Sequence, residues 1–416
     1  MALDPEELKR RRQHRKAQQK AAKKRLITRL CLAGILLAVA MIVIFSLSGG
    51  EDTPEPEATT PIQESTPPEA TQPDNTVIHF AATGDLNITD RVVAAGGSQY
   101  DYSEALMDVG YLLADADLCA VNLEGNLCGS PYGSSASAPQ GLMTSLRKAG
   151  VDMVQLANSY AIHRGVSGLV TTIDSVRQAG IEPVGVFRDQ ADYDSRQGFT
   201  MFQVQGIRVA VISFTKGMDG TTLPPGSENC VNVLYTDYDS VYQKVNREKI
   251  GQIMEAVNLA QPDVTIALLH WGSEFNDTIS SSQKTIKNLL LEQGVDAIIG
   301  SHPHYVQQIE YDPEQGTLVA YSLGDFMGDA ARAGSEYSII LNLEITKDNI
   351  TGRTAITGYD YTPIFSVVEE GKPLRVLRIR EAMAAYNEGF LDAVSKSTYE
   401  AMDYALLRIS QRIAGE

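Results

Sequence analysis

The stretch VIHFAATGDLN, residues 77–87, decides how the rest of the chain is interpreted. Its first half is a short apolar run of the kind found in buried strands. Its second half contains Gly84-Asp85, which would place a carboxylate beyond the carboxyl end of that strand. In open α/β sheets, this is the edge at which ligands bind. The stretch therefore predicts both a strand and one corner of a functional site.

Similar apolar runs follow along the chain and alternate with amphipathic stretches. Further strands are predicted at residues 118–122, 153–156, 183–186, 208–214, 264–269, 297–299, 307–311, 318–321, 338–345 and 355–361. Helices are predicted at residues 103–114, 141–148, 168–179, 241–259 and 284–292, with one or two more over 380–414. This alternation indicates an α/β domain with a largely parallel sheet, and the last strands, which lack intervening helices, indicate added antiparallel pairing.

Several predicted strands end in residues that bind metal ions. They are Asp85, Glu124, Asn158, His270, His302 and His304. Carboxylates combined with imidazoles suit Mn²⁺, Fe²⁺ or Zn²⁺, and two such ions can clamp an oxyanion and activate a water. His302 and His304 are the most specific pair, because alternate residues of an extended segment point to the same side. Each residue alone has a structural explanation, but together they favour one or two divalent ions over coincidental packing.

Two further residues lie close to this set in the sequence. Trp271 is the only tryptophan of the chain, and it either stacks on a substrate or anchors the core. Glu274 is assigned as an accessory or substrate-binding residue. A serine-hydrolase elbow (G-x-S-x-G) is missing from the folded part of the sequence, and so is a P-loop (G-x-x-x-x-G-K-[ST]), which argues against those two classes of enzyme.

Charge is distributed very unevenly along the chain. The net charge is −17, yet residues 1–29 carry eleven Lys or Arg and three Asp or Glu, so the remainder sums to −25. Such an acidic domain is a poor partner for nucleic acid. The acidity serves either solubility, which is the simpler interpretation, or cation binding. The four cysteines have no CxxC spacing, which argues against a zinc ribbon.

The N-terminal part has the composition of a membrane anchor followed by a linker. Residues 1–29 form a basic tail, and residues 30–47 are eighteen uncharged, mostly apolar residues, about 27 Å of helix. The positive-inside rule then keeps the tail in the cytoplasm and places the main domain outside, in a single-pass cell-membrane protein. Residues 48–76 hold six prolines among Thr, Ser and Glu and predict an extended linker. Domain boundaries are therefore expected at residues 77–365 for the main domain and 366–416 for a C-terminal helical extension.

The motifs of residues 77–330 resemble those of the poly-γ-glutamate capsule-synthesis (CapA) family, which is related to calcineurin-like metallophosphoesterases. The matching pieces are Gly84-Asp85, Asn122-Leu123-Glu124, Leu156-Ala157-Asn158, His270-Trp271-Gly272-x-Glu274, Gly300-x-His302-Pro303-His304 and Tyr321-Ser322-Leu323-Gly324. The resemblance implies a four-layer α-β-β-α sandwich, here behind an N-terminal transmembrane helix. It also implies a metal-type site at the strand ends, to which Asp85, Glu124, His270, His302 and His304 would contribute.

The sequence departs from this pattern at a position that matters for catalysis. Where the family commonly has Leu-Ala-Asn-Asn-His, this chain has Ser159 and Tyr160 after Asn158. In related phosphoesterases, the Asn-His pair supplies a metal ligand and a proton donor. Tyr160 or His163 is therefore expected to handle the proton, with His163 reaching the site if the turn is helical. Asn87 and Asp325 also replace family residues, and each adds an oxygen that could bind metal.

The resemblance implies a function in capsule or cell-surface polymer biosynthesis. The mechanism would be metal-assisted hydrolysis or transfer on an anionic polymer of poly-γ-glutamate type, or on a phosphorylated envelope intermediate. Two alternatives stay open: a tethered scaffold or binding protein with a degenerate metal site, and a general envelope phosphoesterase. The expected partners are the membrane and an anionic polymer or its synthesis machinery.

Overall fold

The computed structural model describes residues 74–390 and 393–416. The predicted anchor at residues 30–47 lies outside these ranges. Within them, no helix combines the length and the apolar composition that crossing a bilayer requires. Cys119, Cys128 and Cys230 are free thiols.

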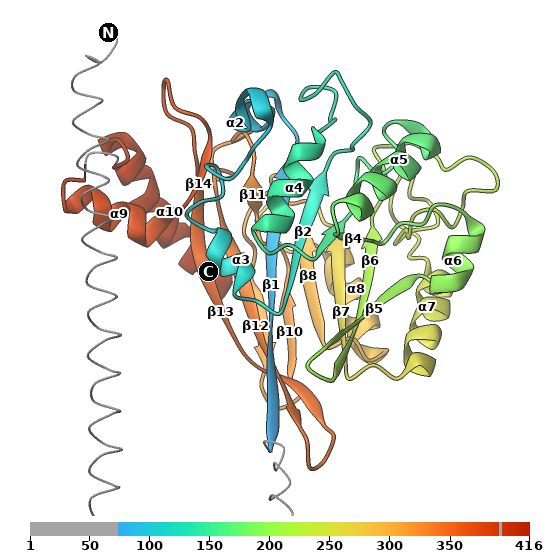
Figure 1. Ribbon diagram of the computed structural model, residues 1–416. Helices are drawn as coiled ribbons and strands as arrows, with labels where there is room; N and C mark the ends of the chain where they lie inside the picture. Colours follow the sequence, from blue (N-terminus) through green and yellow to red (C-terminus); the bar gives the residue numbers. More distant parts are fainter. Residues whose placement is uncertain (1–73, 391–392) are drawn as a thin grey trace, which may run out of the picture. The chain divides into compact units, whose positions relative to one another are not determined.

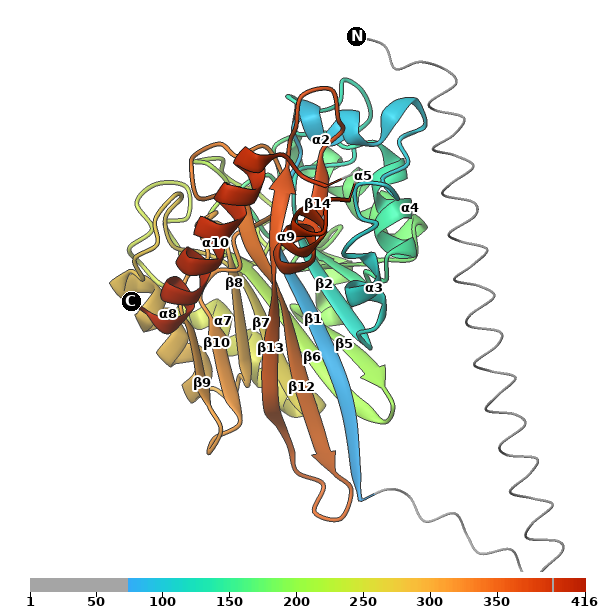
Figure 2. The ribbon, with the colours of Figure 1, turned by 90° about the vertical axis from the view of Figure 1, so that its left-hand side faces the viewer.

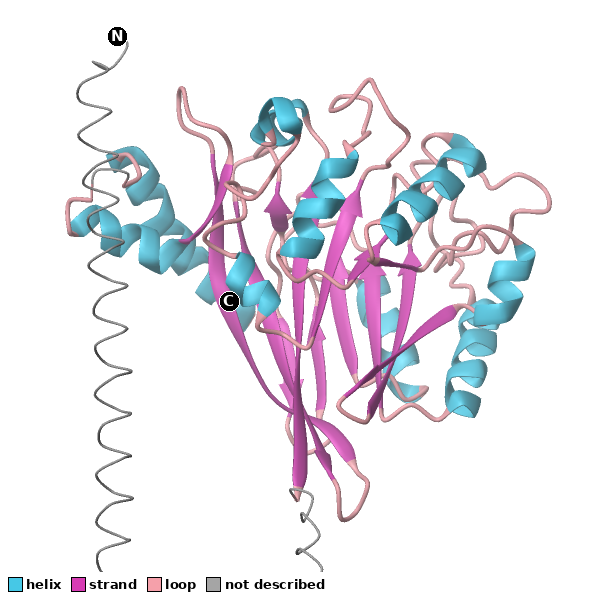
Figure 3. Cartoon of the chain, viewed as in Figure 1, coloured by secondary structure: helices cyan, strands magenta, loops and turns pink. Residues whose placement is uncertain are grey.

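The strands form two mixed sheets (Figures 1 and 3). The first sheet has the spatial order β14 (Arg375–Arg378), β13 (Thr354–Val367), β12 (Tyr337–Asp348), β1 (Asn75–Asn87), β2 (Leu118–Glu124), β3 (Met153–Gln155) and β4 (Glu182–Val184), with β11 (Asp325–Met327) paired to β1. The second has the order β5 (Phe199–Val204), β6 (Ile207–Thr215), β7 (Val264–His270), β8 (Ala297–Ser301), β10 (Thr317–Ala320) and β9 (Ile309–Asp312). Strands β1 to β4 and β6, β7, β8 and β10 run parallel, as βα alternation requires, whereas β5, β9 and β12 to β14 add antiparallel pairs.

Helices connect the strands and cover the sheets. They are α2 (Asp90–Ala95), the 3₁₀ helix η1 (Gly97–Gln99), α3 (Gly110–Ala114), α4 (Gln140–Lys148), α5 (Gly165–Gln178), α6 (Gln190–Arg196), α7 (Arg247–Ala260), α8 (Ser281–Glu292), α9 (Ile379–Asn387) and α10 (Lys396–Ala414). Side-chain caps fix several starting points. In the capping box of α8, for example, Ser280 and Gln283 satisfy each other's backbone N–H groups.

Three apolar clusters hold these layers together. Phe80 of β1 and Ile266 of β7 belong to a cluster that joins the two sheets. Leu142 of α4 belongs to the cluster on the other face of the first sheet, and Ile253 of α7 to the cluster on the other face of the second. A fully buried side chain of this size contributes roughly 1.5–3 kcal/mol relative to exposure. The order of layers is therefore helices, sheet, sheet, helices.

The C-terminal segment is part of this packing. Strand β14 extends the first sheet beyond residue 365, so residues 366–416 are not purely helical as expected. Helices α9 and α10 lie beside β12, β13 and β14 (Figure 2). Met402, Ala405 and Ile409 of α10 are buried in the cluster between the sheets.

Some predicted elements differ from the observed ones for identifiable reasons. The helix predicted at residues 241–259 begins only at Arg247, because Tyr242 has a φ of 53° and Asn246 caps the backbone N–H of Lys249. Strand β5 is not among the predicted strands, because it forms by antiparallel pairing with β6. The two strands are joined by a tight turn in which Gln205 and Gly206 both have positive φ. Residues 103–109 form turns rather than the first half of a helix.

Candidate metal centre

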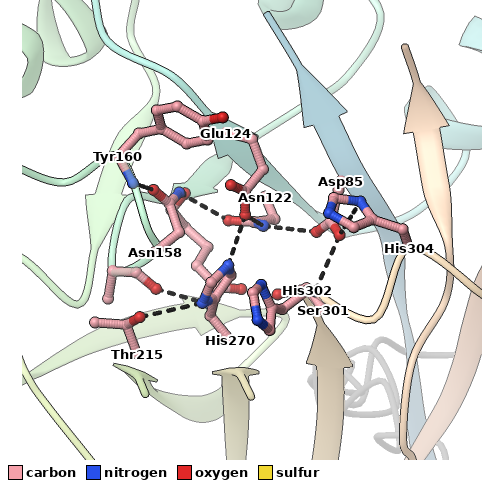
Figure 4. Close-up of polar contacts among 12 residues, drawn as sticks. Asp85, Asn122, Glu124, Asn158, Tyr160, Thr215, His270, Ser301, His302 and His304 are labelled. Carbon is pink, nitrogen blue, oxygen red and sulfur yellow. Dashed lines mark hydrogen bonds and ion pairs between the residues drawn. The ribbon is translucent and has the colours of Figure 1, made fainter. Parts of the chain in front are cut away.

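The carboxyl ends of strands from both sheets meet at one place (Figure 4). Asp85 comes from β1, Glu124 from β2 and His270 from β7, while His302 and His304 follow β8 and Asp325 begins β11. Except for His304, whose side chain is 13% exposed, these residues are at most 5% exposed. The structure thus brings together the main residues that the sequence singled out.

A close backbone approach places Asp85 beside Asp325. A Cβ added to Gly84 would lie 1.7 Å from the carbonyl oxygen of Gly324, so only glycine fits there. The backbone N–H of Asp85 donates to that same oxygen at 3.0 Å, and Asp85 pairs in register with Asp325. The Gly-Asp motif is therefore a structural requirement for bringing two carboxylates together.

The loop after β8 presents two imidazoles in unusual backbone conformations. His302 and His304 have φ values of 91° and 58°, a backbone region that residues other than glycine rarely adopt. Each such conformation costs of order 1–3 kcal/mol. The backbone N–H of His302 donates to Asp85 Oδ2 at 3.0 Å. His304 Nδ1 lies 2.7 Å from Asp325 Oδ1 and 3.6 Å from Asp85 Oδ2. Phe275 stacks on the His304 ring with 4.8 Å between centroids.

Asn122 links the two halves of the centre. Its Nδ2 donates to Asp85 Oδ1 at 2.6 Å and to Glu124 Oε1 at 2.8 Å. Its Oδ1 accepts from Asn158 Nδ2 at 3.0 Å. Asn158, predicted as a ligand, therefore orients Asn122, and its own Oδ1 accepts from the backbone of Tyr160.

The orientation of the His270 ring follows from its neighbours. The Thr215 hydroxyl donates to the Gly217 carbonyl at 2.8 Å, so its oxygen accepts from His270 Nδ1 at 3.1 Å. The other ring nitrogen, Nε2, lies 2.8 Å from Glu124 Oε1. The contact has the length of a hydrogen bond but not its geometry, and Nε2 has no hydrogen-bond partner although it is buried.

Burial and mutual repulsion shift the acidities of the centre. Burial, together with the charge of Glu124, raises the pKa of Asp85 to about 7. Burial also raises the pKa of Asp325, against the effect of His304. Burial alone would lower the pKa of His304, but its hydrogen bond to Asp325 and the surrounding carboxylates raise it to about 10. The pKa of His302 falls well below its usual value because of burial and the neighbouring His270.

These residues fit a divalent cation. Two sets of three possible ligand atoms lie within 4.8 Å of one another, Asp85 with His304 and Asp325, and Glu274 with His302 and His304. The buried Nε2 of His270 has no hydrogen-bond partner and lies beside Glu124, so it is placed to serve as a ligand atom. A cation would also relieve the crowding of buried carboxylates. The mixture of carboxylate and imidazole suits Zn²⁺, Mn²⁺ or Fe²⁺.

The two residues predicted to handle the proton lie at the border of the centre. Tyr160 is half-buried beside Glu124, and burial, followed by the charge of Glu124, raises its pKa to about 12. His163 is exposed and touches the site only through its edge contact with the Tyr160 ring, at 5.7 Å between centroids. The turn does bring the two side chains to the same side, because His163 N–H donates to the Tyr160 carbonyl.

The remaining predicted residues have different surroundings. Trp271 is completely buried, donates from Nε1 to the Tyr321 carbonyl at 2.8 Å and stacks on that ring, so it anchors the core and does not stack on substrate. Glu274 is exposed at the edge of the centre. Asn87 is partly buried and hydrogen-bonds Asp325, which lowers the pKa of that carboxyl against the effect of burial.

Three residues of the site were missed in the sequence. Asn122 belongs to a quoted motif but was not assigned a role, although it bonds two carboxylates. Thr215 is the last residue of strand β6 and Lys216 follows it, so both lie at a strand end where no site residue is predicted. The rule that ligands bind beyond the carboxyl ends of parallel strands would have identified both.

Comparison with known proteins gives a consistent family. Residues 79–330 match the family described as "Bacterial capsule synthesis protein PGA_cap". The chain is 26% identical over 256 residues to the capsule biosynthesis protein CapA of Bacillus anthracis, covering 61% of this chain and 56% of that protein. It is 27% identical over 219 residues to the PGA biosynthesis protein CapA of Bacillus subtilis, covering 52% of each. The chain thus spans about half the length of these relatives.

Among solved structures, the chain is similar to a calcineurin-like phosphoesterase from Bacillus subtilis, with 14% identity and a TM-score of 0.44 over 80% of this chain and 99% of the other. Because the family match extends over more than half of its length, the chain belongs to the bacterial capsule synthesis protein PGA_cap family.

Proposed function

We propose that this chain is a metal-dependent enzyme of capsule or cell-surface polymer biosynthesis that hydrolyses or transfers a unit of a poly-γ-glutamate type polymer. The single observation that carries the proposal is the convergence of three buried carboxylates and three imidazoles at the strand ends of both sheets. Family membership suggests the polymer, because the chain is similar to relatives named for capsule and PGA biosynthesis.

Each part of the centre has a role in this proposal. Asp85, Glu124, Asp325, His270, His302 and His304 would hold one or two divalent ions. A bound ion supplies Lewis-acid polarisation of a carbonyl or phosphoryl oxygen. Asn122 and Thr215 orient ligand side chains, and the Tyr160 phenol keeps its proton at neutral pH because its pKa is about 12.

The proposal includes a location. The uncharged run at residues 30–47 would anchor the chain in the cell membrane, with the basic tail of residues 1–29 in the cytoplasm. Residues 48–76 would then carry the main domain away from the membrane surface on the outside. This location suits an enzyme that acts on a surface polymer.

The test combines metal analysis with activity. The full chain would be purified, reconstituted separately with Mn²⁺, Fe²⁺ and Zn²⁺, and analysed for bound metal beside a His302→Ala/His304→Ala variant. One or two ions per chain, lost in the variant, together with metal-dependent cleavage of a γ-glutamyl polymer, are expected. Cleavage of model phosphoesters with none of γ-glutamyl polymer would instead indicate a general phosphoesterase.

A second candidate is a tethered binding protein that has lost catalysis. The raised pKa of Tyr160 favours it, since a phenol with a pKa of about 12 is a slow general acid at neutral pH. Absence of bound metal from the wild-type chain after reconstitution would support this candidate and overturn the metal-dependent enzyme.

A further inference from the structure

A separate cavity opens beside the metal centre. Its volume is about 220 Å³, smaller than the roughly 300–1,000 Å³ of pockets that hold drug-sized ligands. Its lining includes Ser159, Lys216, Asp219, Tyr242, Glu274 and His302. His302 therefore faces both this cavity and the metal centre, so a small polar group bound here would lie next to the metal ligands.

Lys216 is the only cation among the residues that line the cavity. It follows β6 directly, and its backbone N–H donates to the His270 carbonyl at 2.8 Å, which fixes its place beside the centre. Its Nζ donates to the Gly272 carbonyl at 2.8 Å and lies 4.7 Å from the centroid of the Tyr242 ring. An ammonium group has three N–H donors, so two remain for a ligand.

Two carboxylates share the cavity with this lysine. Asp219 and Glu274 are both exposed to solvent. Burial lowers the pKa of Lys216, and the charges of Glu274 and Asp219 partly offset this. One cation flanked by two anions is a poor receptor for a phosphate dianion, which the carboxylates would repel. It suits a ligand that carries a carboxylate and an ammonium group on neighbouring atoms, as the end of an amino-acid chain does.

We propose that this cavity binds the free amino-terminal unit of a γ-linked glutamate chain, with its α-carboxylate on Lys216 and its α-ammonium group between Asp219 and Glu274. This inference rests on the proposed function and makes it more specific. In a γ-linked chain every unit has a free α-carboxylate, but only the first has a free α-amine. The cavity would thus recognise the chain end, and the γ-amide of that unit would lie toward His302.

The test is calorimetric titration of the full chain in detergent, in the presence of a chelator so that binding does not depend on metal. The probes are γ-glutamyl-glutamate, its N-acetyl derivative and inorganic phosphate. We expect the free dipeptide to bind at least 5-fold more tightly than the N-acetyl form. Lys216→Met should weaken binding of the dipeptide about 10- to 100-fold, in line with loss of a charged hydrogen bond. Asp219→Asn should weaken binding of the free dipeptide but leave binding of the N-acetyl form unchanged.

Lys249→Met is the matched control, because Lys249 also lies over a tyrosine ring, 3.7 Å from the Tyr193 centroid, but does not line the cavity. It should leave binding unchanged. Equal affinities for the free and N-acetyl dipeptides, stronger binding of phosphate, or no effect of Lys216→Met would each overturn the inference. Asp219 is exposed, so its variant remains informative if Lys216→Met does not fold. If the wild-type chain binds the dipeptide but takes up no metal on reconstitution, the binding would support this inference and the missing metal would overturn the metal-dependent mechanism.

Discussion

At the scale of single residues, the orientation of the His270 ring depends on Thr215, a residue outside the proposed set of metal ligands. Thr215 accepts from His270 Nδ1 and thereby directs Nε2 toward Glu124. Partners that orient metal-binding imidazoles in this way typically contribute 10- to 100-fold in metal affinity or activity.

Thr215→Val should therefore lower metal affinity about 10- to 100-fold, because the methyl group that replaces the hydroxyl cannot accept from Nδ1. Competition with a chromophoric chelator measures the affinity. Thr215→Ser keeps the hydroxyl and should restore most of it. Equal affinities for the valine and serine variants would contradict an orienting role.

A carboxyl far from the centre makes a prediction about pH. Burial raises the pKa of Asp296 from 3.8 to about 6, although the Thr265 N–H donates to it at 2.7 Å. A carboxyl with a higher pKa in the folded state binds its proton more tightly there. Its stabilising contribution is complete below about pH 4 and is lost as the pH rises through about 6.

Asp296→Asn removes this dependence. The free energy of unfolding of the variant, relative to wild type, should increase by about 1–2 kcal/mol between pH 4 and pH 7, a value reduced for the partial exposure of the group. Urea titrations at several pH values measure it. Asp403→Asn, on the exposed side of α10, is the control and should show a flat difference. A flat difference for Asp296→Asn as well would exclude a raised pKa.

At the scale of secondary-structure elements, helix α10 is part of the core and not an appended extension. Ile409 is 1% exposed and packs in the cluster between the sheets, whereas Leu407 on the same helix is 57% exposed. Ile409→Ala should lower the free energy of unfolding by about 2–4 kcal/mol through lost burial and a cavity. Leu407→Ala should change it by less than about 0.5 kcal/mol.

Chemical denaturation followed by circular dichroism measures both variants. If α10 were only an extension, Ile409→Ala would resemble Leu407→Ala, or the loss would appear as a separate early transition. The same helix also reaches the site loops, since Arg412 contacts Asp277 at 3.4 Å and lies over the Tyr305 ring.

At the scale of the whole molecule, a metal ion should stabilise the fold. The centre joins the two sheets and gathers the buried carboxylates of Asp85, Glu124 and Asp325. A ligand that binds only the folded state adds about 2.7 kcal/mol at 100 times its Kd. We therefore expect Mn²⁺ or Zn²⁺ to raise the Tm of the full chain by several degrees.

Differential scanning fluorimetry with and without chelator measures this shift. His302→Ala/His304→Ala should abolish it, and His163→Ala should leave it intact, because His163 is exposed outside the ligand sets. The same rise in all three proteins would show that the stabilisation arises elsewhere.

The sequence by itself determined the α/β class, most of the long strands and the polar residues at their ends. Apolar runs and strand-terminal motifs are local, and β1, β2, β7 and β8 were all located from them within a few residues. Asp85, Glu124, His270, His302 and His304 could be predicted as site residues for the same reason, since each lies at or just after the end of a recognisable strand.

Only the tertiary structure decided the rest. Strands β5, β11 and β14 exist because neighbouring strands pair with them, and backbone conformations such as that of Tyr242 interrupted an apparently continuous helical pattern. The roles of Asn122 and Thr215, the core position of Trp271 and the cavity around Lys216 arise where segments distant in sequence meet. Local patterns carry no information about such contacts, because burial and hydrogen-bond partners are fixed by how the two sheets pack together.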